Sequence, residues 1–393
     1  MSGFEYGMAD FQAVAAGAAV LASGGGGSYQ DALAILQQLA DSGWNGTVAV
    51  QDYDGATNGC VLAIMGSPDA ADNLTLANVA NAIRNTITVL EASTGFSLGC
   101  VIPVEIGPIN SLVPLIAAAL SNGKLWVVNG DGAGRAVPEL PQTTFGGSPD
   151  LAPGPCALAS DEAAASAVES AVLNASSAAK VETLAGGVVA GFGGYSGIAL
   201  WPSNAGNGYA LSGNYIAGTL TQARALGQLL LNAATPPTTA EVAFAIAAIT
   251  GRAATATVTN FYITAVTQST SSASLDSGII RLDIAPVPSD STQTHYLYNL
   301  NENLILYSIS SAAPNTLAPD SICYYSESTG RGFSNASDDL AAYFNTATGK
   351  STGNTVSVIE VTAAPQLYQS PGVVASFAGL LRNMGYAGAM PAA

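Results

Sequence analysis

Residues 100–139, CVIPVEIGPINSLVPLIAAALSNGKLWVVNGDGAGRAVPE, carry the pattern that decides the fold of the N-terminal part. The apolar run at 100–106 predicts a strand, residues 110–120 predict a helix, and residues 125–128 predict a second strand. Parallel strands need a crossover between them, and a helix is the usual one. The stretch therefore predicts an α/β layer with parallel pairing.

The alternation extends toward the N-terminus. Residues 8–22 and 29–40 are predicted helices, residues 47–51 and 61–65 are predicted strands, and apolar residues at helical spacing predict an amphipathic helix over 75–92.

Beyond the opening stretch the alternation weakens. The segment Pro149–Pro155 is typical of a boundary or a long loop, and residues 161–178 predict a helix. Residues 183–223 contain no charged residue, but glycines and a proline interrupt them. No clean run of about 20 apolar residues remains, so we expect buried strands and tight turns there and no membrane span. A helix is predicted over 217–233.

The composition changes near Gly251. From there to about Leu367 the chain is rich in Thr, Ser, Ile, Val and Tyr in short runs separated by turn residues. This pattern predicts an all-β domain, either a barrel or a sandwich. Residues 371–385 predict a helix.

Charge is scarce and acidic. The 393 residues include 10 Lys and Arg, 27 Asp and Glu and one His, for a net charge of −17, and 9% of the chain is charged where roughly 25% is usual. Only three lysines occur, which argues against nucleic acid and anionic membranes as main partners. The four cysteines form no C-x-x-C pair, and the first ten residues lack a basic start before an apolar run. We therefore expect a cytoplasmic protein with buried thiols.

The densest polar cluster, residues 129–139, directly follows a predicted strand. Asp131, Arg135 and Glu139 lie within nine residues there, and ligands of open α/β sheets bind outside the carboxyl ends of strands. We favour a functional site, and the alternative is a tight turn with a structural Asp–Arg pair. Glu105 also ends a predicted strand, where a buried carboxylate needs a partner or a ligand, and structural pairing with Arg135 is the alternative.

A run of four glycines, Gly24–Gly27, precedes Ser28 and Asp31, which fit a variant capping box for the helix over 29–40. Amides at such a helix N-terminus attract anions, while a plain flexible connector is the alternative. The run does not match a dinucleotide fingerprint. At the next strand end, Met65-Gly66-Ser67-Pro68 favours a purely structural turn.

Histidine chemistry is restricted because His295 is the sole histidine and lies in a predicted strand. A multi-His metal site within one chain is excluded, and a Ser–His–Asp triad is disfavoured. A divalent metal held by carboxylates such as Asp131, Glu139 or Glu105 stays open.

Motifs spread along the chain resemble one known family. They are, in order, ASGGGGSY (22–29), MGSP (65–68), PVEIGPIN (103–110), NGDGAGRAVPELPQTTF (129–145), AGTLTQARALG (217–227), NLNENLILY (299–307) and APDSICYYSESTG (318–330). In this order they resemble the S-methyl thiohydantoin desulfurase family, from about Phe11 to about Leu367. Members of that family are often found beside or fused to hydantoinase-type proteins.

The resemblance implies a fold and a reaction. The fold is α/β plus all-β, with an N-terminal three-layer α/β/α domain over 1–165 and a C-terminal domain over 166–393, β-barrel-like in about 251–367. The reaction is hydrolysis of a small cyclic S-methyl thiohydantoin or a related cyclic imide, which releases methanethiol. Alternatives are a non-catalytic binding or regulatory subunit beside a hydantoinase-like enzyme and, more weakly, a self-assembling structural protein. A homo-oligomer stays open.

For the hydrolase we predict site residues by role. Asp131 or Glu139 is the general base or a metal ligand, and Glu105 orients Arg135 or the water. Arg135 binds a ring carbonyl or a substrate carboxylate. The remaining predicted substrate-binding residues are Gly25, Gly26 and Gly27, whose amides hold an anionic part, together with Asn110, Thr144, Asn301 and Glu302.

Overall fold

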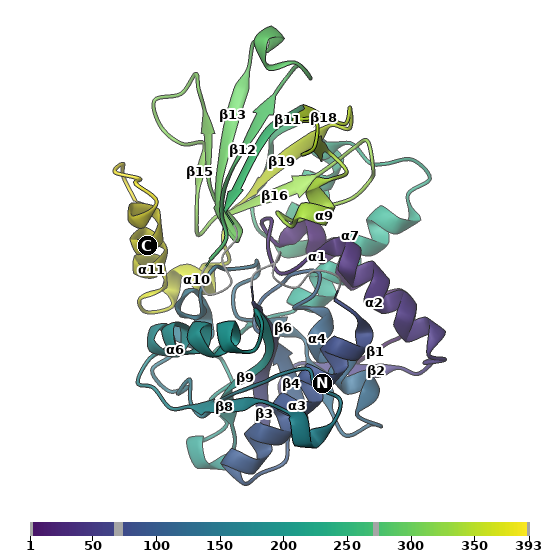
Figure 1. The fold of residues 1–393 in the computed structure, drawn as a ribbon, viewed down its shortest axis with the longest axis vertical. Helices are drawn as coiled ribbons and strands as arrows, with labels where there is room; N and C mark the ends of the chain where they lie inside the picture. The colour runs from purple at the N-terminus through teal and green to yellow at the C-terminus, as the bar shows by residue number, and fades with distance from the viewer. Residues whose placement is uncertain (1–2, 67–73, 270–274, 391–393) are drawn as a thin grey trace.

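The computed structural model describes residues 3–66, 74–269 and 275–390. The β-rich C-terminal part is stacked on the α/β part along the longest axis of the molecule (Figure 1). The α/β part is built on an eight-stranded mixed sheet in the order β1-β2-β5-β4-β3-β9-β7-β8. Its strands are β1 (Phe4–Tyr6), β2 (Val48–Gln51), β3 (Gly59–Gly66), β4 (Cys100–Pro103), β5 (Trp126–Val128), β7 (Cys156–Ala159), β8 (Ser170–Leu173) and β9 (Tyr195–Ser203). The strands β2, β5, β4 and β3 pair in parallel, as the strand–helix alternation predicts, and the outer pairings are antiparallel.

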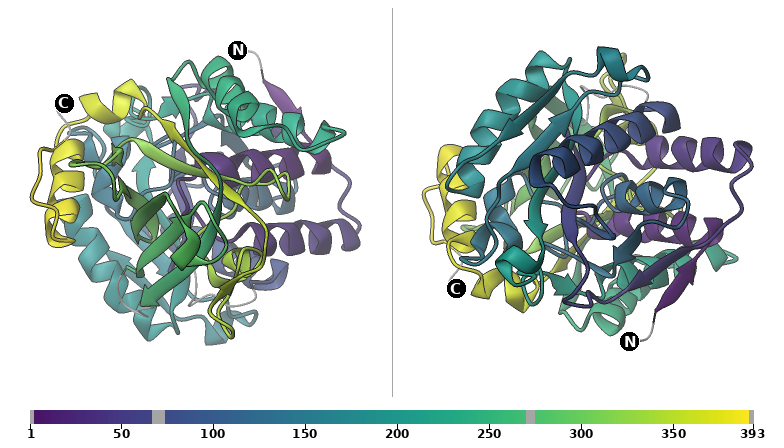
Figure 2. Two further views of the ribbon diagram at one scale, coloured as in Figure 1. Left: turned by 90° about the horizontal axis from the view of Figure 1, so that it is seen from above. Right: turned by 90° about the horizontal axis from the view of Figure 1, so that it is seen from below.

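Helices cover both faces of this sheet, which gives the predicted three layers (Figure 2). Alternate residues of β3 show the division: Cys60 and Leu62 belong to the core beneath the helices on one face, whereas Val61 and Ala63 pack with α6 on the other. The helices of the first face are α1 (Met8–Leu21), α2 (Tyr29–Asp41), α3 (Leu76–Thr94) and α4 (Leu112–Leu120), and α6 spans Ala178–Gly191.

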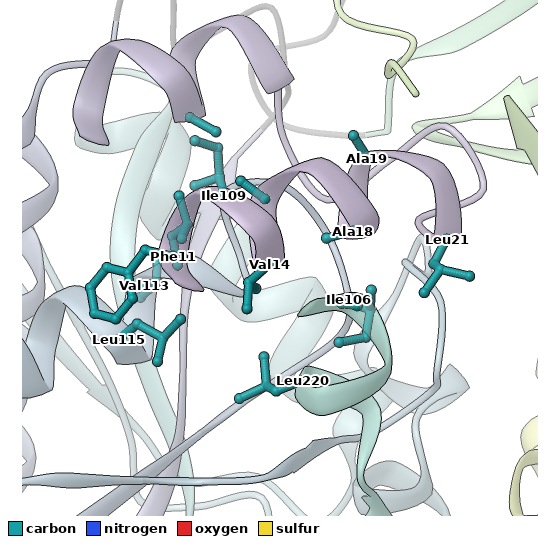
Figure 3. Packing of buried hydrophobic residues seen from close by; sticks show 14 of the residues in the cluster. Phe11, Val14, Ala18, Ala19, Leu21, Ile106, Ile109, Val113, Leu115 and Leu220 are labelled. Carbon is teal, nitrogen blue, oxygen red and sulfur yellow. The ribbon is translucent and has the colours of Figure 1, made fainter. Parts of the chain in front are cut away.

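Helix α1 is buried nearly all round, which explains its alanine-rich sequence. Figure 3 shows Val14 of α1 near Leu220 of α7 (Thr219–Asn232). The two helices meet at glycines: a Cβ on Gly17 would lie 1.8 Å from the Ala223 carbonyl oxygen, and one on Gly227 would lie 1.8 Å from that of Ala13. The backbones therefore approach as closely as only glycine allows.

The C-terminal part is an antiparallel sheet that is nearly closed into a barrel, in the order β15-β14-β13-β12-β11-β19-β16. Its two edge regions are connected because Asn303 donates from Nδ2 to the Ile322 carbonyl oxygen at 2.9 Å, and the Ile322 amide donates to Ser23 Oγ at 2.8 Å. The strands are β11 (Ala254–Ser269), β12 (Ser277–Asp283), β13 (Thr294–Leu300), β14 (Glu302–Ser308), β15 (Thr316–Leu317), β16 (Ser321–Tyr325) and β19 (Val356–Val361). The sequence predicted an all-β barrel or sandwich, and the structure confirms the barrel-like form.

Shorter elements complete the described part of the chain. Two-stranded ribbons are formed by β6 (Gly130–Asp131) with β10 (Ile216–Ala217) and by β17 (Phe344–Asn345) with β18 (Lys350–Ser351). The remaining helices are α5 (Thr144–Gly147), α8 (Thr239–Thr250), α9 (Ser337–Leu340), α10 (Pro365–Gln369) and α11 (Val373–Asn383), and 3₁₀ turns are formed by Leu140–Gln142, Ala165–Ala167, Ala205–Asn207 and Pro288–Asp290. The predicted C-terminal helix is confirmed by α11.

Two sequence predictions between the two parts are wrong. The alanine-rich residues 161–178 do not form a helix, because β8 pairs with β7 at the edge of the sheet and this pairing overrides local propensity. Conversely, a helix, α6, occupies the first part of the segment predicted as glycine-rich strands. Ser177 caps its N-terminus, and Val181, Ala185 and Val189 bury one face against the sheet, which offsets the helical cost of the glycines.

The eight-stranded sheet takes strands from both sides of residue 165, since β8 and β9 follow it. The domain division at that residue stays a prediction. Across the three described segments, no helix combines the length and the apolar character needed to cross a bilayer.

Candidate functional site

A pocket of about 520 Å³ lies where the two parts of the molecule meet. Its lining comes mainly from β3 and β9, the loop after β4, the loop before α2 and the first turn of α2, the segment before α5, the helix α6 and the turn between β13 and β14. It therefore includes the carboxyl end of a parallel strand, where ligands of α/β sheets bind. Its volume suits a small ring compound.

Glu105 lies on this wall two residues after the end of β4. Its side chain is buried, and its two oxygens accept hydrogen bonds from Asn110 Nδ2 at 2.8 Å and from the Val137 amide at 2.7 Å. Burial raises the pKa of Glu105 to about 7. Its carboxyl group can therefore accept or release a proton near neutral pH.

Glu302 enters the pocket from the β domain. Asn301 alone connects β13 to β14, in the left-handed conformation with φ of 54°, and this turn places Glu302 at the first position of β14. Glu302 is 4% exposed, and its Oε2 has no hydrogen-bond partner. Burial, reinforced by the negative charge of Glu105, raises the pKa of Glu302 well above its ordinary value. The raised pKa favours the protonated form of Glu302.

The two carboxyl groups form a pair with separate environments. Glu105 has two donors that stabilise its ionised form, whereas Glu302 has an unpartnered oxygen and the negative charge of Glu105 as a neighbour. Two adjacent carboxyl groups whose pKa values are driven apart are typical of a general base beside a general acid. The pair has the components for proton transfer on both sides of a bound ring.

Arg135, predicted to bind substrate, is outside the pocket lining and fully buried. Its guanidinium donates to the carbonyl oxygens of Ala136 (2.8 Å), Pro319 (3.1 Å), Asp320 (2.8 Å) and Asn303 (3.0 Å). These bonds join the loop after β6 to the β domain. Arg135 therefore supplies a buried positive charge behind the Glu105–Glu302 pair, and its role as a substrate ligand stays a prediction.

Asp131 is also outside the lining and fully buried. Its carboxylate accepts from the amides of Ala133 (2.9 Å) and Gly134 (2.8 Å), which holds the glycine-rich turn after β6 closed. Burial raises its pKa to about 6. Arg252 is the arginine whose charge acts on it, rather than Arg135. This placement favours a structural role, and the predicted catalytic role of Asp131 remains untested.

The glycine run before α2 is a closely packed loop. Gly24, Gly26 and Gly27 have positive φ, and a Cβ on Gly25 would lie 2.0 Å from Glu302 Oε1. The Glu302 carboxyl group therefore lies directly against this loop, and the Gly26 backbone lowers its pKa. The loop expected to hold an anionic part of the substrate thus meets a carboxyl group of the protein itself.

The amides at the N-terminus of α2 also have acceptors within the protein. Ser28 Oγ accepts from the Asp31 amide, as the predicted cap requires, at 3.1 Å. The amides of Tyr29 and Gln30, the first two residues of α2, donate to the two oxygens of Asp339 at 3.0 and 3.1 Å. Asp339 also accepts from the amide and hydroxyl of Ser334, so one buried carboxylate joins α2 to the β domain.

Replacing Asp339 with Ala should lower the free energy of unfolding by about 2–4 kcal/mol, because it leaves buried amides without acceptors at a helix N-terminus. Urea denaturation followed by circular dichroism measures the change. Asp290→Ala, at an exposed position, is the control and should have little effect. Equal stability of the two variants would contradict the assignment.

The pocket contains other predicted residues and some that the sequence interpretation missed. Glu139 lines it, and burial raises its pKa. Glu182 of α6 also lines it and accepts from the Leu140 amide at 2.9 Å, and burial raises the pKa of Glu182 to about 7. Its rarity as a charge was a usable signal, but Glu182 lies just before the uncharged segment 183–223, outside the motifs that the sequence analysis singled out. The remaining lining residues relevant here are Gly26, Gly27, Asp31, Asn110 and Asn301.

Two further predicted residues are not in the lining. Gly25 lies behind it, and the Thr144 hydroxyl donates to the Asn214 carbonyl oxygen at 2.9 Å.

His295 is buried in β13 with its ring nearly perpendicular to that of Phe261, and burial lowers its pKa. Ser67 and Pro68 of the predicted structural turn lie outside the described residues.

The carboxylates do not fit a metal ion. Within residues 3–66, 74–269 and 275–390, no three His, Cys, Asp or Glu side chains are grouped as metal ligands would be. Asp131 and Glu105 instead accept hydrogen bonds from backbone amides and, for Glu105, from the Asn110 side chain.

Comparisons with known proteins agree with the fold. The sequence matches two family models, described as S-Me-THD-like, N-terminal domain, over residues 9–170, and S-Me-THD-like, C-terminal domain, over residues 176–376. No curated protein matches it. A solved structure of a protein from Chromobacterium violaceum is similar at 24% identity, covers 99% of both chains and has a TM-score of 0.79. At this identity the likeness shows a shared fold alone.

Proposed function

The chain belongs to the S-Me-THD-like family, that of S-methyl thiohydantoin desulfurase-like proteins, and on that premise we propose that it hydrolyses a small cyclic S-methyl thiohydantoin. The reaction replaces the methylthio group by oxygen. Water adds to the ring carbon that carries sulfur, the bond between that carbon and sulfur breaks, and methanethiol leaves. The ring carbon becomes a carbonyl carbon, so the product is the corresponding hydantoin.

Both protons of the water must leave its oxygen, and one is delivered to the ring nitrogen and the other to the departing sulfur. Glu105, held by Asn110 and by the Val137 amide, takes a proton from the attacking water and passes it to the ring nitrogen. Glu302, in its protonated form, donates to the departing sulfur, so that methanethiol leaves, and it recovers a proton from the added hydroxyl group as the ring carbonyl forms. Asn110 is a positioning residue, since its Oδ1 accepts from the Ile64 amide at 3.2 Å while its Nδ2 fixes Glu105.

The observation that carries this proposal is the unpartnered Oε2 of Glu302. A buried carboxyl oxygen without a partner is costly, and it lies in the wall of a pocket that suits a five-membered ring. A bound ligand that hydrogen bonds to this oxygen would remove the cost.

The direct test is an assay of the purified protein with a synthetic S-methyl thiohydantoin. We expect release of methanethiol, detected with a thiol reagent, together with an equal amount of hydantoin, detected by mass spectrometry. Binding without release would overturn the catalytic proposal and favour a non-catalytic binding subunit beside a hydantoinase-like enzyme.

The rate should depend on pH through Glu105. This base works when ionised, and its pKa is about 7, so kcat/KM should increase about tenfold between about pH 6 and about pH 8. The rate should fall again once the pH is high enough for Glu302 to lose its proton. Initial rates across this range check the profile, and a rate that decreases from about pH 6 to about pH 8 would contradict the assignment of Glu105 as the base.

A further inference from the structure

The charged side chains that line the pocket are all acidic. Five carboxylic side chains line it: Asp31, Glu105, Glu139, Glu182 and Glu302. Among the described residues that line it, none is Lys, Arg or His. The phenol of Tyr195 is the other ionisable group on the wall.

The structural elements that ordinarily bind anions are already occupied by the protein. The Glu302 carboxyl group lies against the backbone of the glycine loop, and the first amides of α2 donate to Asp339. The four guanidinium bonds of Arg135 all go to backbone carbonyl oxygens. A ligand carboxylate would therefore enter a partly desolvated space with no cationic side chain to meet it.

Glu302 Oε2, which is buried and unpartnered, serves the departing sulfur in the proposed function. The wall on the α6 side favours a ligand group of the opposite charge to a carboxylate. On the α6 side, Glu139 and Glu182 are close enough that the charge of Glu139 raises the pKa of Glu182 further after burial has raised it. A positive group or a hydrogen-bond donor placed there would reduce this repulsion.

We infer that the pocket admits rings whose side chain is uncharged or positively charged and excludes rings whose side chain carries a carboxylate. Glu182 and Glu139 determine this selectivity. The inference rests on the proposed function for the identity of the ring, and it adds the class of ring substituent. It also predicts that the ring-opened acid, which carries a carboxylate, binds weakly.

Calorimetric titration can test the selectivity without turnover. The probes are three hydantoins, which lack the leaving group, with a propyl, a butylammonium or a propionate side chain on the same ring carbon. We expect the propionate compound to bind at least about tenfold more weakly than the propyl compound, because like charges repel strongly in a desolvated pocket. The butylammonium compound should bind at least as tightly as the propyl compound.

Glu182→Gln is the informative variant, because it removes one negative charge at nearly constant shape. It should narrow the gap between the propionate and propyl compounds several-fold, whereas the exposed Glu169→Gln should leave the gap unchanged. Equal or tighter binding of the propionate compound to the wild type would overturn the inference, and so would an unchanged gap in Glu182→Gln.

The outcomes also separate this inference from the proposed function. Methanethiol release without discrimination among side chains overturns the selectivity alone. Discrimination among hydantoins without methanethiol release overturns the hydrolase alone. Failure of all three hydantoins to bind overturns the assignment of this pocket to the ring, and the selectivity with it.

Discussion

Replacing Glu302 with Gln should reduce methanethiol release by about 10²–10⁴-fold, the contribution expected of one general acid. The amide cannot donate a proton to the departing sulfur. Folding should be little affected, because the raised pKa of Glu302 favours its neutral form and Gln has nearly the same shape. The loss should appear mainly in kcat, since the interaction with the leaving group develops in the transition state.

The matched control is Glu169→Gln, the same chemical change at an exposed residue outside the pocket. Its rate and melting temperature should equal those of the wild type. Wild-type turnover in Glu302→Gln would rule out Glu302 as the acid. A large fall in melting temperature would show instead that the residue acts through folding.

Replacing Gly17 with Ala should lower the free energy of unfolding by about 2–4 kcal/mol or prevent folding. The new Cβ would lie 1.8 Å from the Ala223 carbonyl oxygen and 2.9 Å from the Gly227 amide nitrogen. Both atoms are backbone of α7, so no side chain can rotate away, and the two helices must separate along a buried interface. Urea denaturation measures the loss, and Gly227→Ala should show the same effect because the contact is reciprocal.

Gly187→Ala is the control for helix propensity. Gly187 is in α6, and a Cβ there meets nothing within 4 Å. This substitution should raise stability by roughly 0.5–1 kcal/mol, because alanine is the better helix former. A Gly17→Ala protein as stable as the wild type would show that the α1–α7 crossing can relax.

The sequence predicted those elements whose pattern and burial agree. The apolar spacing over 75–92 predicted α3, and the strand–helix–strand order over 100–128 predicted β4, α4 and β5. It was wrong over 161–191, where an alanine-rich stretch pairs at a sheet edge and a glycine-rich stretch is helical. Local propensity is weak there, and contacts with the rest of the sheet decide the conformation.

For the site, charge scarcity directed attention to loops that border the pocket, but it did not separate the side chains that line the pocket from those that do not. Glu105 and Glu302 were named, and they lie 197 positions apart in a chain that brings them to one pocket. Arg135 and Asp131 belong to the polar cluster at residues 129–139, yet their hydrogen bonds go to backbone groups away from the pocket. Nothing in the spacing of the residues distinguishes these two arrangements.

The sequence by itself determined the family and the α/β and all-β composition, because motif order and periodicity are properties of the chain. Only the tertiary structure decided which charges face the ligand. The glycine-rich loop and the helix start after it suggest an anion-binding site in the sequence. The fold shows instead that the Glu302 carboxyl group lies against the loop and that Asp339 accepts hydrogen bonds from the first amides of α2. The physical reason is that a buried donor must be satisfied, and only the assembled chain shows by what.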